Sequence, residues 1–179
     1  MSNFAKKQLS RHGWKIIDKE SVPMKCVICI APHTSNWDFI WGLLYKRAMR
    51  LKANFFMKKE WFRFPLGKIM RSLGGIPVNR SKKSSLTEII AAEFGKHDVF
   101  RLGVTPEGTR KANSQWKLGF YFIALKAQVP IVLAKIDYAK KEIGCAESFL
   151  PTGNLELDLQ RIKDFYQGVV GKIPNNFAL

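Results

Sequence analysis

The sequence predicts an α/β fold in which one mixed sheet is layered with helices. Three observations favour this fold. Apolar runs of strand length alternate with stretches of helical periodicity, as expected for a sheet covered by helices. The chain has 179 residues, 46% of them hydrophobic, which is enough for a single sizeable core. No internal repeat or Pro/Gly/Ser-rich linker divides the sequence, so we expect one domain over residues 1–179.

The alternation begins with an apolar strand. Residues 25–31 are rich in Val, Ile and Cys and precede Pro32, which predicts a buried strand that ends in a turn. A helix should follow, because residues 34–36 are good N-cap residues and apolar side chains continue with roughly helical spacing to Met49. The next expected elements are a strand at 54–57, a helix at 66–73 that two glycines end, and a strand at 76–78.

The same alternation continues through the second half of the chain. Residues 85–96 have helical periodicity, with Leu86, Ile89, Ile90 and Phe94 on one face. The remaining expected elements are a strand at 99–104, a helix at 120–127, a strand at 130–136 and a helix at 155–170. In α/β sheets of this kind, functional residues tend to lie just beyond the ends of strands.

The chain carries a large positive charge. Thirty Lys and Arg against fourteen Asp and Glu leave a net charge of +16, so the surface should attract phospholipid headgroups, nucleic acid or phosphorylated substrates. Charge alone leaves these partners open. A basic nucleic-acid-binding protein is the main alternative from another class, but no helix-turn-helix, zinc-finger or RNA-recognition signature supports it, and no nucleic-acid partner is expected.

The cysteines and the apolar runs bear on the compartment. Cys26 and Cys29 lie inside the apolar run CVICIA, and we interpret them as small buried hydrophobic residues. No signal peptide and no apolar stretch of the ~20 residues needed to span a bilayer is evident, which favours a reducing cytoplasm. No cluster of acids or histidines suggests a metal, and no cofactor is expected.

The run APHTSNWDF places His33 directly after the first predicted strand and Asp38 five residues later. Positions i and i+5 of an ideal helix point about 140° apart, so the two side chains could not meet if both were helical. We therefore expect His33 in the loop before the helix, with Asp38 one turn inside and facing back. Such a carboxylate can orient the imidazole as a general base. A polar cap at the helix start is the alternative interpretation.

Two further runs each place an arginine just past a predicted strand. GGIPVNR ends in Arg80, and VTPEGTR contains Glu107, Gly108, Thr109 and Arg110. Guanidinium groups suit phosphate and glycine permits close backbone approach, so the two segments could cradle a phosphate. Backbone amides around Gly108 are candidate oxyanion donors. Glu107 and Arg110 should orient each other, which favours a positioning role for Glu107. Ordinary turns with solvated arginines are the alternative.

In this order and spacing, PHTSNWD, GGIPVNR, TPEGTR and VPIVLAKI resemble the four blocks of the lysophosphatidic acid (1-acylglycerol-3-phosphate) acyltransferase family. The resemblance runs from about Pro32 to Ile136. It implies a glycerol-3-phosphate acyltransferase-like α/β fold. It also implies transfer of a fatty acyl group from acyl-CoA or acyl carrier protein to a lysophospholipid, by default 1-acylglycerol-3-phosphate, giving phosphatidic acid. Another lysophospholipid or an amino-acid lipid is the alternative acceptor.

The resemblance also implies a role for each motif residue. His33 is the general base and Asp38 its partner, while Arg80 and Glu107–Arg110 bind the acceptor phosphate. The chain departs from the common family pattern at Pro32 and in the second and third blocks, which leaves the exact acceptor open. A non-catalytic lipid-binding relative is a further alternative.

Residues 58–65, KKEWFRFP, interleave Trp61, Phe62 and Phe64 with basic residues. This composition is typical of shallow insertion of aromatic side chains beside anionic headgroups, and packing in the core is the alternative. Insertion would place the protein in the cytoplasm, peripherally on the inner face of the membrane.

Overall fold

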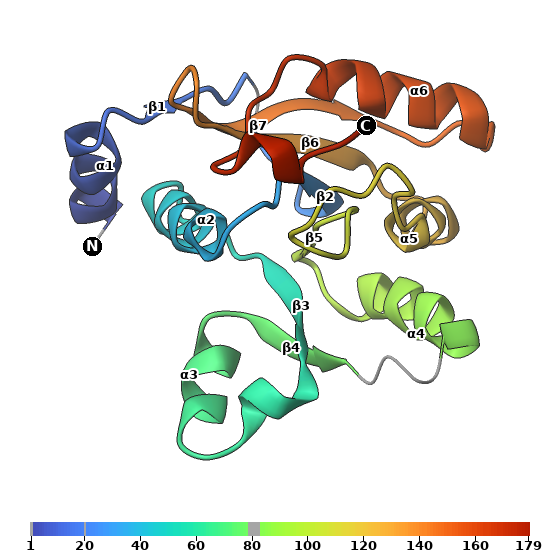
Figure 1. The fold of residues 1–179 in the computed structure, drawn as a ribbon. Helices are drawn as coiled ribbons and strands as arrows, with labels where there is room; N and C mark the ends of the chain where they lie inside the picture. The colour runs from blue at the N-terminus through green and yellow to red at the C-terminus, as the bar shows by residue number, and fades with distance from the viewer. Residues whose placement is uncertain (1, 20, 79–82) are drawn as a thin grey trace.

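The computed structural model describes residues 2–19, 21–78 and 83–179, and it has the predicted α/β architecture (Figure 1). Within these residues, the strands are β1 (Lys15–Ile16), β2 (Lys25–Ala31), β3 (Asn54–Lys58), β4 (Gly75–Val78), β5 (Phe100–Val104), β6 (Ile131–Asp137) and β7 (Glu142–Phe149). They form a seven-stranded sheet in the order β1-β7-β6-β2-β5-β3-β4. The β6–β7 pair is antiparallel and the other pairs are parallel, so the sheet is mixed, as predicted.

Helices cover both faces of this sheet (Figure 1). The described helices are α1 (Ser2–Arg11), α2 (Asn36–Ala48), α3 (Leu66–Ser72), α4 (Lys83–Lys96), α5 (Gly119–Ala127) and α6 (Leu155–Tyr166), with short 3-10 turns η1 (Lys59–Phe62) and η2 (Pro174–Asn176). Helices α1 and α2 pack on one face, and α4, α5 and α6 pack on the other. None of the described helices combines the length and apolar character that crossing a membrane requires.

The side chains of β2 alternate between the two faces, because successive residues of a strand point in opposite directions. Val27 and Cys29 join the core under α4, α5 and α6, whereas Cys26 and Ile28 join the core under α1 and α2. Cys26, Cys29 and Cys145 are free and buried, which confirms the interpretation of Cys26 and Cys29 as small buried hydrophobic residues. Burial raises the pKa of each thiol to about 12.

Every predicted element is present, but the sequence pattern missed α1, β1 and β7. Helix α1 is mostly polar and buries Ala5 and Leu9, so it has few apolar residues to mark it in the sequence. Strand β7 contains Gly144 and several polar residues, which hides its alternation. The last helix ends at Tyr166 rather than at residue 170, because the chain turns at Gly168, where φ is +73°.

Strands β5, β2 and β6 are adjacent and parallel, so their carboxyl ends lie at one edge of the sheet. Residues 32–35 follow β2, residues 105–118 follow β5, and residues 138–141 follow β6. The predicted motif residues of the first and third blocks therefore meet at this edge, with the loop after β2 in the middle.

Because β6 is buried, we expect that truncating one of its side chains lowers the free energy of unfolding substantially. Leu133 is 0% exposed, so Leu133→Ala should lower the free energy of unfolding by about 2–5 kcal/mol through lost contacts and a residual cavity. The matched change Leu157→Ala, at a side chain that is 66% exposed, should stay within about 0.5 kcal/mol of the wild type. Urea unfolding of both variants checks this, and equal midpoints would contradict the assigned core.

Candidate active site

His33 lies in the loop between β2 and α2, at the carboxyl edge of the sheet, and its side chain is 24% exposed. Its Nδ1 atom is 3.6 Å from Oδ2 of Asp38, which belongs to the first turn of α2. This separation is longer than a hydrogen bond, so the two groups interact here through charge. The prediction that His33 precedes the helix and that Asp38 faces back toward it is confirmed. Because Nδ1 faces the carboxylate, Nε2 is the nitrogen on the far side of the ring.

The Asp38 carboxylate is buried and is held by three hydrogen bonds. Its Oδ2 atom accepts the backbone N–H groups of Thr34 and Ser35, each at 2.7 Å, and Oδ1 accepts the hydroxyl of Tyr138 at 2.7 Å. Ser35 is the N-cap of α2: its side chain accepts the backbone N–H of Trp37, and its reciprocal contacts with Asp38, the N3 residue, form a capping box. The helix cap and the histidine partner were alternative interpretations of the same residue. In the structure Asp38 caps the helix and also faces His33.

Tyr138 was not identified from the sequence. It lies directly after β6 and reaches Asp38 across 100 positions of the chain. Burial, the hydrogen bond to Asp38 and the charge of Asp38 all raise the pKa of the Tyr138 phenol, so it stays protonated and donates. The only signal in the sequence is its position two residues beyond the end of the fourth block, just past a predicted strand.

Glu107 is turned inward and is 1% exposed. Its Oε1 atom accepts the backbone N–H of His33 at 2.9 Å, and its buried Oε2 atom has no partner among the described residues. Burial raises the pKa of this carboxyl to about 7, the hydrogen bond from His33 opposes that shift, and the charge of Asp38 adds to it. The expectation that Glu107 and Arg110 orient each other is wrong, because Glu107 binds the His33 loop and Arg110 points elsewhere.

Arg110 is exposed and lies beside the first turn of α2, where its Nη1 atom contacts Oδ1 of Asn36. Its charge reaches His33. Burial lowers the pKa of the His33 imidazole, the charge of Asp38 raises it, and the charge of Arg110 lowers it further. The net direction is downward, so the imidazole is neutral at neutral pH and has a lone pair available.

Gly108 forms the turn between Glu107 and Arg110. It has φ +64°, and its N–H donates to the carbonyl of Thr105 at 3.2 Å, so the amide considered as an oxyanion donor is already engaged. A Cβ atom at Gly108 would lie 2.6 Å from Cδ of Lys117, which places a further cation at this turn that the sequence did not reveal. Thr109 is exposed beside it, while Arg80 lies outside the described residues.

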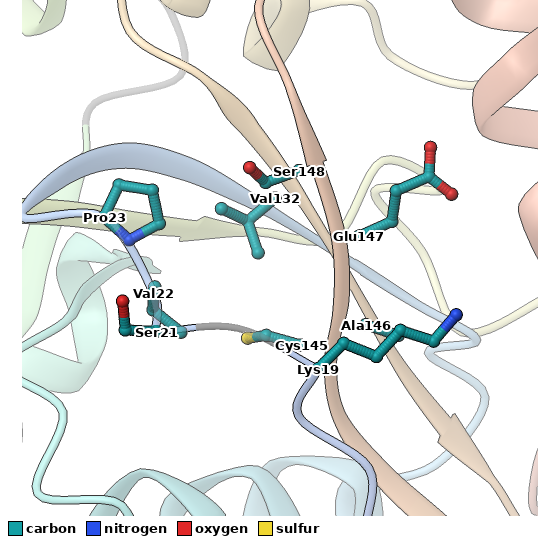
Figure 2. Close-up of a pocket in the computed structure, with 9 residues that line it drawn as sticks. All are labelled: Lys19, Ser21, Val22, Pro23, Val132, Cys145, Ala146, Glu147 and Ser148. Carbon is teal, nitrogen blue, oxygen red and sulfur yellow. The ribbon is translucent and has the colours of Figure 1, made fainter.

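A hollow of about 320 Å³ lies on the α1–α2 face, toward the opposite edge of the sheet (Figure 2). Figure 2 shows the Cys145 sulfur facing Ser21 and Val22, and none of the nine labelled lining residues is a predicted site residue. The lining residues are Lys19, Ser21, Val22, Pro23, Val132, Cys145, Ala146, Glu147 and Ser148. Within the described part of the chain, no group of three or more His, Cys, Asp or Glu side chains could hold a metal ion.

Known proteins are similar to the part of the chain that contains these site residues. A model of the acyltransferase family matches residues 14–136. Human 1-acyl-sn-glycerol-3-phosphate acyltransferase beta is 36% identical over 115 residues, which cover 60% of this chain and 39% of the human protein. This chain therefore spans about two fifths of that relative's length.

The fold also resembles a solved structure. The crystal structure of the 1-acyl-sn-glycerophosphate (LPA) acyltransferase PlsC from Thermotoga maritima matches with a TM-score of 0.62, over 92% of this chain and 74% of that chain, at 19% identity. This similarity confirms the predicted fold. The family match spans more than half of the chain and includes every motif residue from His33 to Arg110. The chain therefore belongs to the acyltransferase family.

Proposed function

We propose that the protein transfers a fatty acyl group from a thioester of coenzyme A or acyl carrier protein to 1-acylglycerol-3-phosphate, forming phosphatidic acid. The observation that carries this proposal is that Nδ1 of His33 faces the buried carboxylate of Asp38, while Arg110 lies beside the first turn of the same helix. The family supplies the reaction class. The names of the human relative and of the Thermotoga protein both specify a 1-acylglycerol phosphate acceptor for those enzymes, which supports the same acceptor here.

In the proposed reaction, Nε2 of His33 removes the proton from the acceptor hydroxyl as its oxygen attacks the thioester carbonyl carbon. The C–O bond forms, the C–S bond breaks, and the leaving thiolate receives the proton from the imidazolium of His33. Asp38 lies 3.6 Å from Nδ1 and stabilises the imidazolium formed midway. No acyl-enzyme intermediate is needed, because both substrates meet at the same base.

The remaining motif residues divide between binding and positioning. We assign the acceptor phosphate to Arg110, with Arg80, Gly108 and Thr109 as further predicted contacts. Glu107 was grouped with them from the sequence. A buried carboxylate that holds the His33 backbone is better suited to positioning the catalytic loop, so we assign it that task.

We further propose that the protein attaches to anionic membranes through residues 59–71, which we name the η1–α3 surface. Phe64 is 89% exposed, and Trp61, Leu66 and Ile69 are also exposed there. Of the aromatic residues in the predicted insertion segment, only Phe62 packs inward, under the guanidinium of Arg71. The surface projects from the main body beside β3 and β4 (Figure 1).

The charges of the η1–α3 surface suit an anionic bilayer. Its exposed basic residues are Lys59, Arg63, Lys68 and Arg71, against one acid, Glu60. Each cation near such a surface contributes about 1 kcal/mol of attraction, and the exposed aromatic side chains can enter the interface beside the headgroups. An interfacial position would also bring the active site to a lipid acceptor.

The proposed activity predicts thiol release that depends on His33. Wild type should release thiol from acyl-CoA or acyl carrier protein in the presence of 1-acylglycerol-3-phosphate. His33→Ala should slow the reaction by about 10²–10⁴-fold, because general-base catalysis contributes on that scale. Asp38→Asn should also be slower, with an unchanged donor and acceptor preference. The measurement is a thiol assay across a panel that includes other lysophospholipids and an amino-acid lipid.

His97→Ala, at an exposed histidine elsewhere, serves as the matched control and should keep full activity. A higher rate with another acceptor would reassign the acceptor within the same chemistry. If wild type and variants released thiol at one background rate with every donor and acceptor, the enzyme proposal would fail and a non-catalytic lipid-binding role would replace it.

The raised pKa of Glu107 predicts a pH-dependent contribution to stability. The carboxyl ionises at its ordinary pKa of 4.5 when unfolded and at about 7 when folded. Its stabilising contribution is therefore complete below pH 4.5 and is lost as pH rises through 7, by up to about 3 kcal/mol. Glu107→Gln removes this titration, so the unfolding free energy of the wild type relative to the variant should fall from pH 4.5 to 8. Parallel curves would contradict the assignment, and Glu60→Gln, at an exposed side chain, is the matched control.

Membrane attachment predicts sedimentation with vesicles that contain phosphatidylglycerol at low salt, where electrostatic attraction is strongest. Changing Trp61 and Phe64 together to Ser should lower vesicle affinity by about tenfold or more, because inserted aromatic surface is lost. Phe122→Ser, at an exposed phenylalanine of α5, is the matched control and should bind as wild type does. Failure of wild type to sediment, or an unaffected double variant, would refute the η1–α3 surface.

A further inference from the structure

Direct acyl transfer brings two phosphate-bearing substrates to His33 at the same time. Because the two phosphates repel each other, a separate cation for each favours simultaneous binding. The described motif cation Arg110 lies in the loop after β5, on one side of the central strand β2. On the other side of β2 lies β6, whose following loop carries Tyr138. That flank has no basic residue in any of the motifs recognised from the sequence except Lys135, which pairs with Glu142.

The loop after β6 carries Lys140 and Lys141, and Lys141 directs its ammonium group over the Trp14 ring. The segment after α6 adds a further basic residue to this flank. We name residues 170–173 the C-terminal strap. Figure 1 shows the red end of the chain returning from α6 toward the carboxyl end of β2 and toward α2. The carbonyl of Val170 accepts the backbone N–H of Tyr138 at 2.9 Å, and the N–H of Ile173 donates to Oγ1 of Thr34 at 3.2 Å. The strap is therefore bonded to the loops after both β6 and β2.

Close packing holds the centre of the strap in place. Gly171 is buried so tightly against the His33 loop that an added Cβ atom would lie 2.7 Å from Cγ2 of Thr34 and 3.2 Å from Cβ of Pro32. A larger residue could not occupy this position without moving the loop. The residue that follows, Lys172, is thus delivered to the site by an anchored backbone and not by a free tail.

Lys172 directs its ammonium group toward two aromatic residues of the active site. Its Nζ atom lies 5.7 Å from the centre of the Trp37 ring and 5.8 Å from that of Tyr138. The residue is exposed, and among the described residues no ion pair joins it to a carboxylate. Trp37 is itself 51% exposed. Lys172 is therefore an exposed cation, with no acidic partner among the described residues, near the tyrosine that bonds Asp38.

Arg110 and Lys172 approach the first turn of α2 from different flanks. Arg110 contacts Asn36, the first residue of the helix, and Lys172 contacts Trp37, the second. Since β5 and β6 lie on opposite sides of β2, Arg110 and Lys172 place a cation toward each neighbouring strand. This arrangement matches a reaction in which two anionic substrates converge on one base.

We propose that Lys172 binds the phosphate of the donor's phosphopantetheine arm, while Arg110 binds the acceptor phosphate. This inference rests on the proposed acyl transfer and assigns the donor side of the same site. Coenzyme A carries this phosphate within a diphosphate, and acyl carrier protein carries it within a phosphodiester. A lysine ammonium is a point charge that suits either form, whereas the guanidinium fork suits the terminal phosphate of the acceptor.

A crossed kinetic experiment tests the assignment. Lys172→Ala should raise the KM for the acyl donor about tenfold and leave the KM for the acceptor unchanged, because it removes one charge-assisted contact to the donor. Arg110→Ala should do the reverse. Lys172→Arg should restore the donor KM in large part. Lys140→Ala removes an exposed charge from the neighbouring β6–β7 turn and should change neither constant.

The donor series separates the phosphate contact from other effects. With S-acyl-pantetheine, which lacks the phosphate, wild type and Lys172→Ala should have the same donor KM. A raised KM with acyl-CoA, with acyl carrier protein, or with both supports the proposal and identifies the donor in use. Thermal unfolding of Lys172→Ala should match the wild type, which excludes a folding defect.

Three results would overturn the proposal. They are an equal rise in KM with the phosphate-free donor, a rise in the acceptor KM for Lys172→Ala, and weaker vesicle sedimentation with an unchanged donor KM, which would assign Lys172 to membrane binding. Each presupposes that the wild type is active. If the wild type transferred no acyl group from any donor, the proposed function would fail first, and the two failures are thereby distinguished.

Discussion

The carboxylate of Asp38 is the group on which the geometry of the site depends. It is buried, and a buried carboxylate is stable only when its oxygens are hydrogen-bonded. The donors come from the backbone of Thr34 and Ser35 and from the hydroxyl of Tyr138. These donors belong to the loop after β2 and to the chain after β6. Satisfying one carboxylate therefore fixes the start of α2, the path of the His33 loop and the end of a neighbouring strand.

The two buried carboxylates near His33 are in different environments, and that difference separates their tasks. Asp38 accepts three hydrogen bonds, whereas Glu107 accepts one and has a second oxygen with no partner among the described residues. Burial and the nearby charge of Asp38 accordingly raise the pKa of Glu107 to about 7. Asp38 is the carboxylate suited to facing a developing imidazolium. Glu107 is suited to holding the histidine backbone, since that hydrogen bond survives protonation of one carboxyl oxygen.

The parts of the site that were predictable are those within a few residues of one another. The five-residue spacing of His33 and Asp38 determined that one lies before the helix and the other faces back, and the structure agrees. The contact of Tyr138 with Asp38 spans 100 positions and depends on β6 lying beside β2, which no local pattern encodes. The expected contact between Glu107 and Arg110 is wrong for a local reason. Gly108, which lies between them, adopts a left-handed conformation, and the two side chains point toward different partners. Helix α1 is mostly polar, and β7 mixes polar residues and a glycine among its apolar ones, so neither offers the apolar run by which the other elements were predicted.

His33 follows β2, which lies between β5 and β6, and this position affects how substrate preference can change. The loop after β5 lies within the stretch that matches the acyltransferase family model, whereas the C-terminal strap lies beyond it. Neither segment carries His33. Arg110 of the first segment contacts Asn36, and Lys172 of the second contacts Trp37. In the proposed arrangement, acceptor and donor recognition therefore reside in separate segments, and substitutions in one can alter its substrate without moving His33 or the other phosphate site.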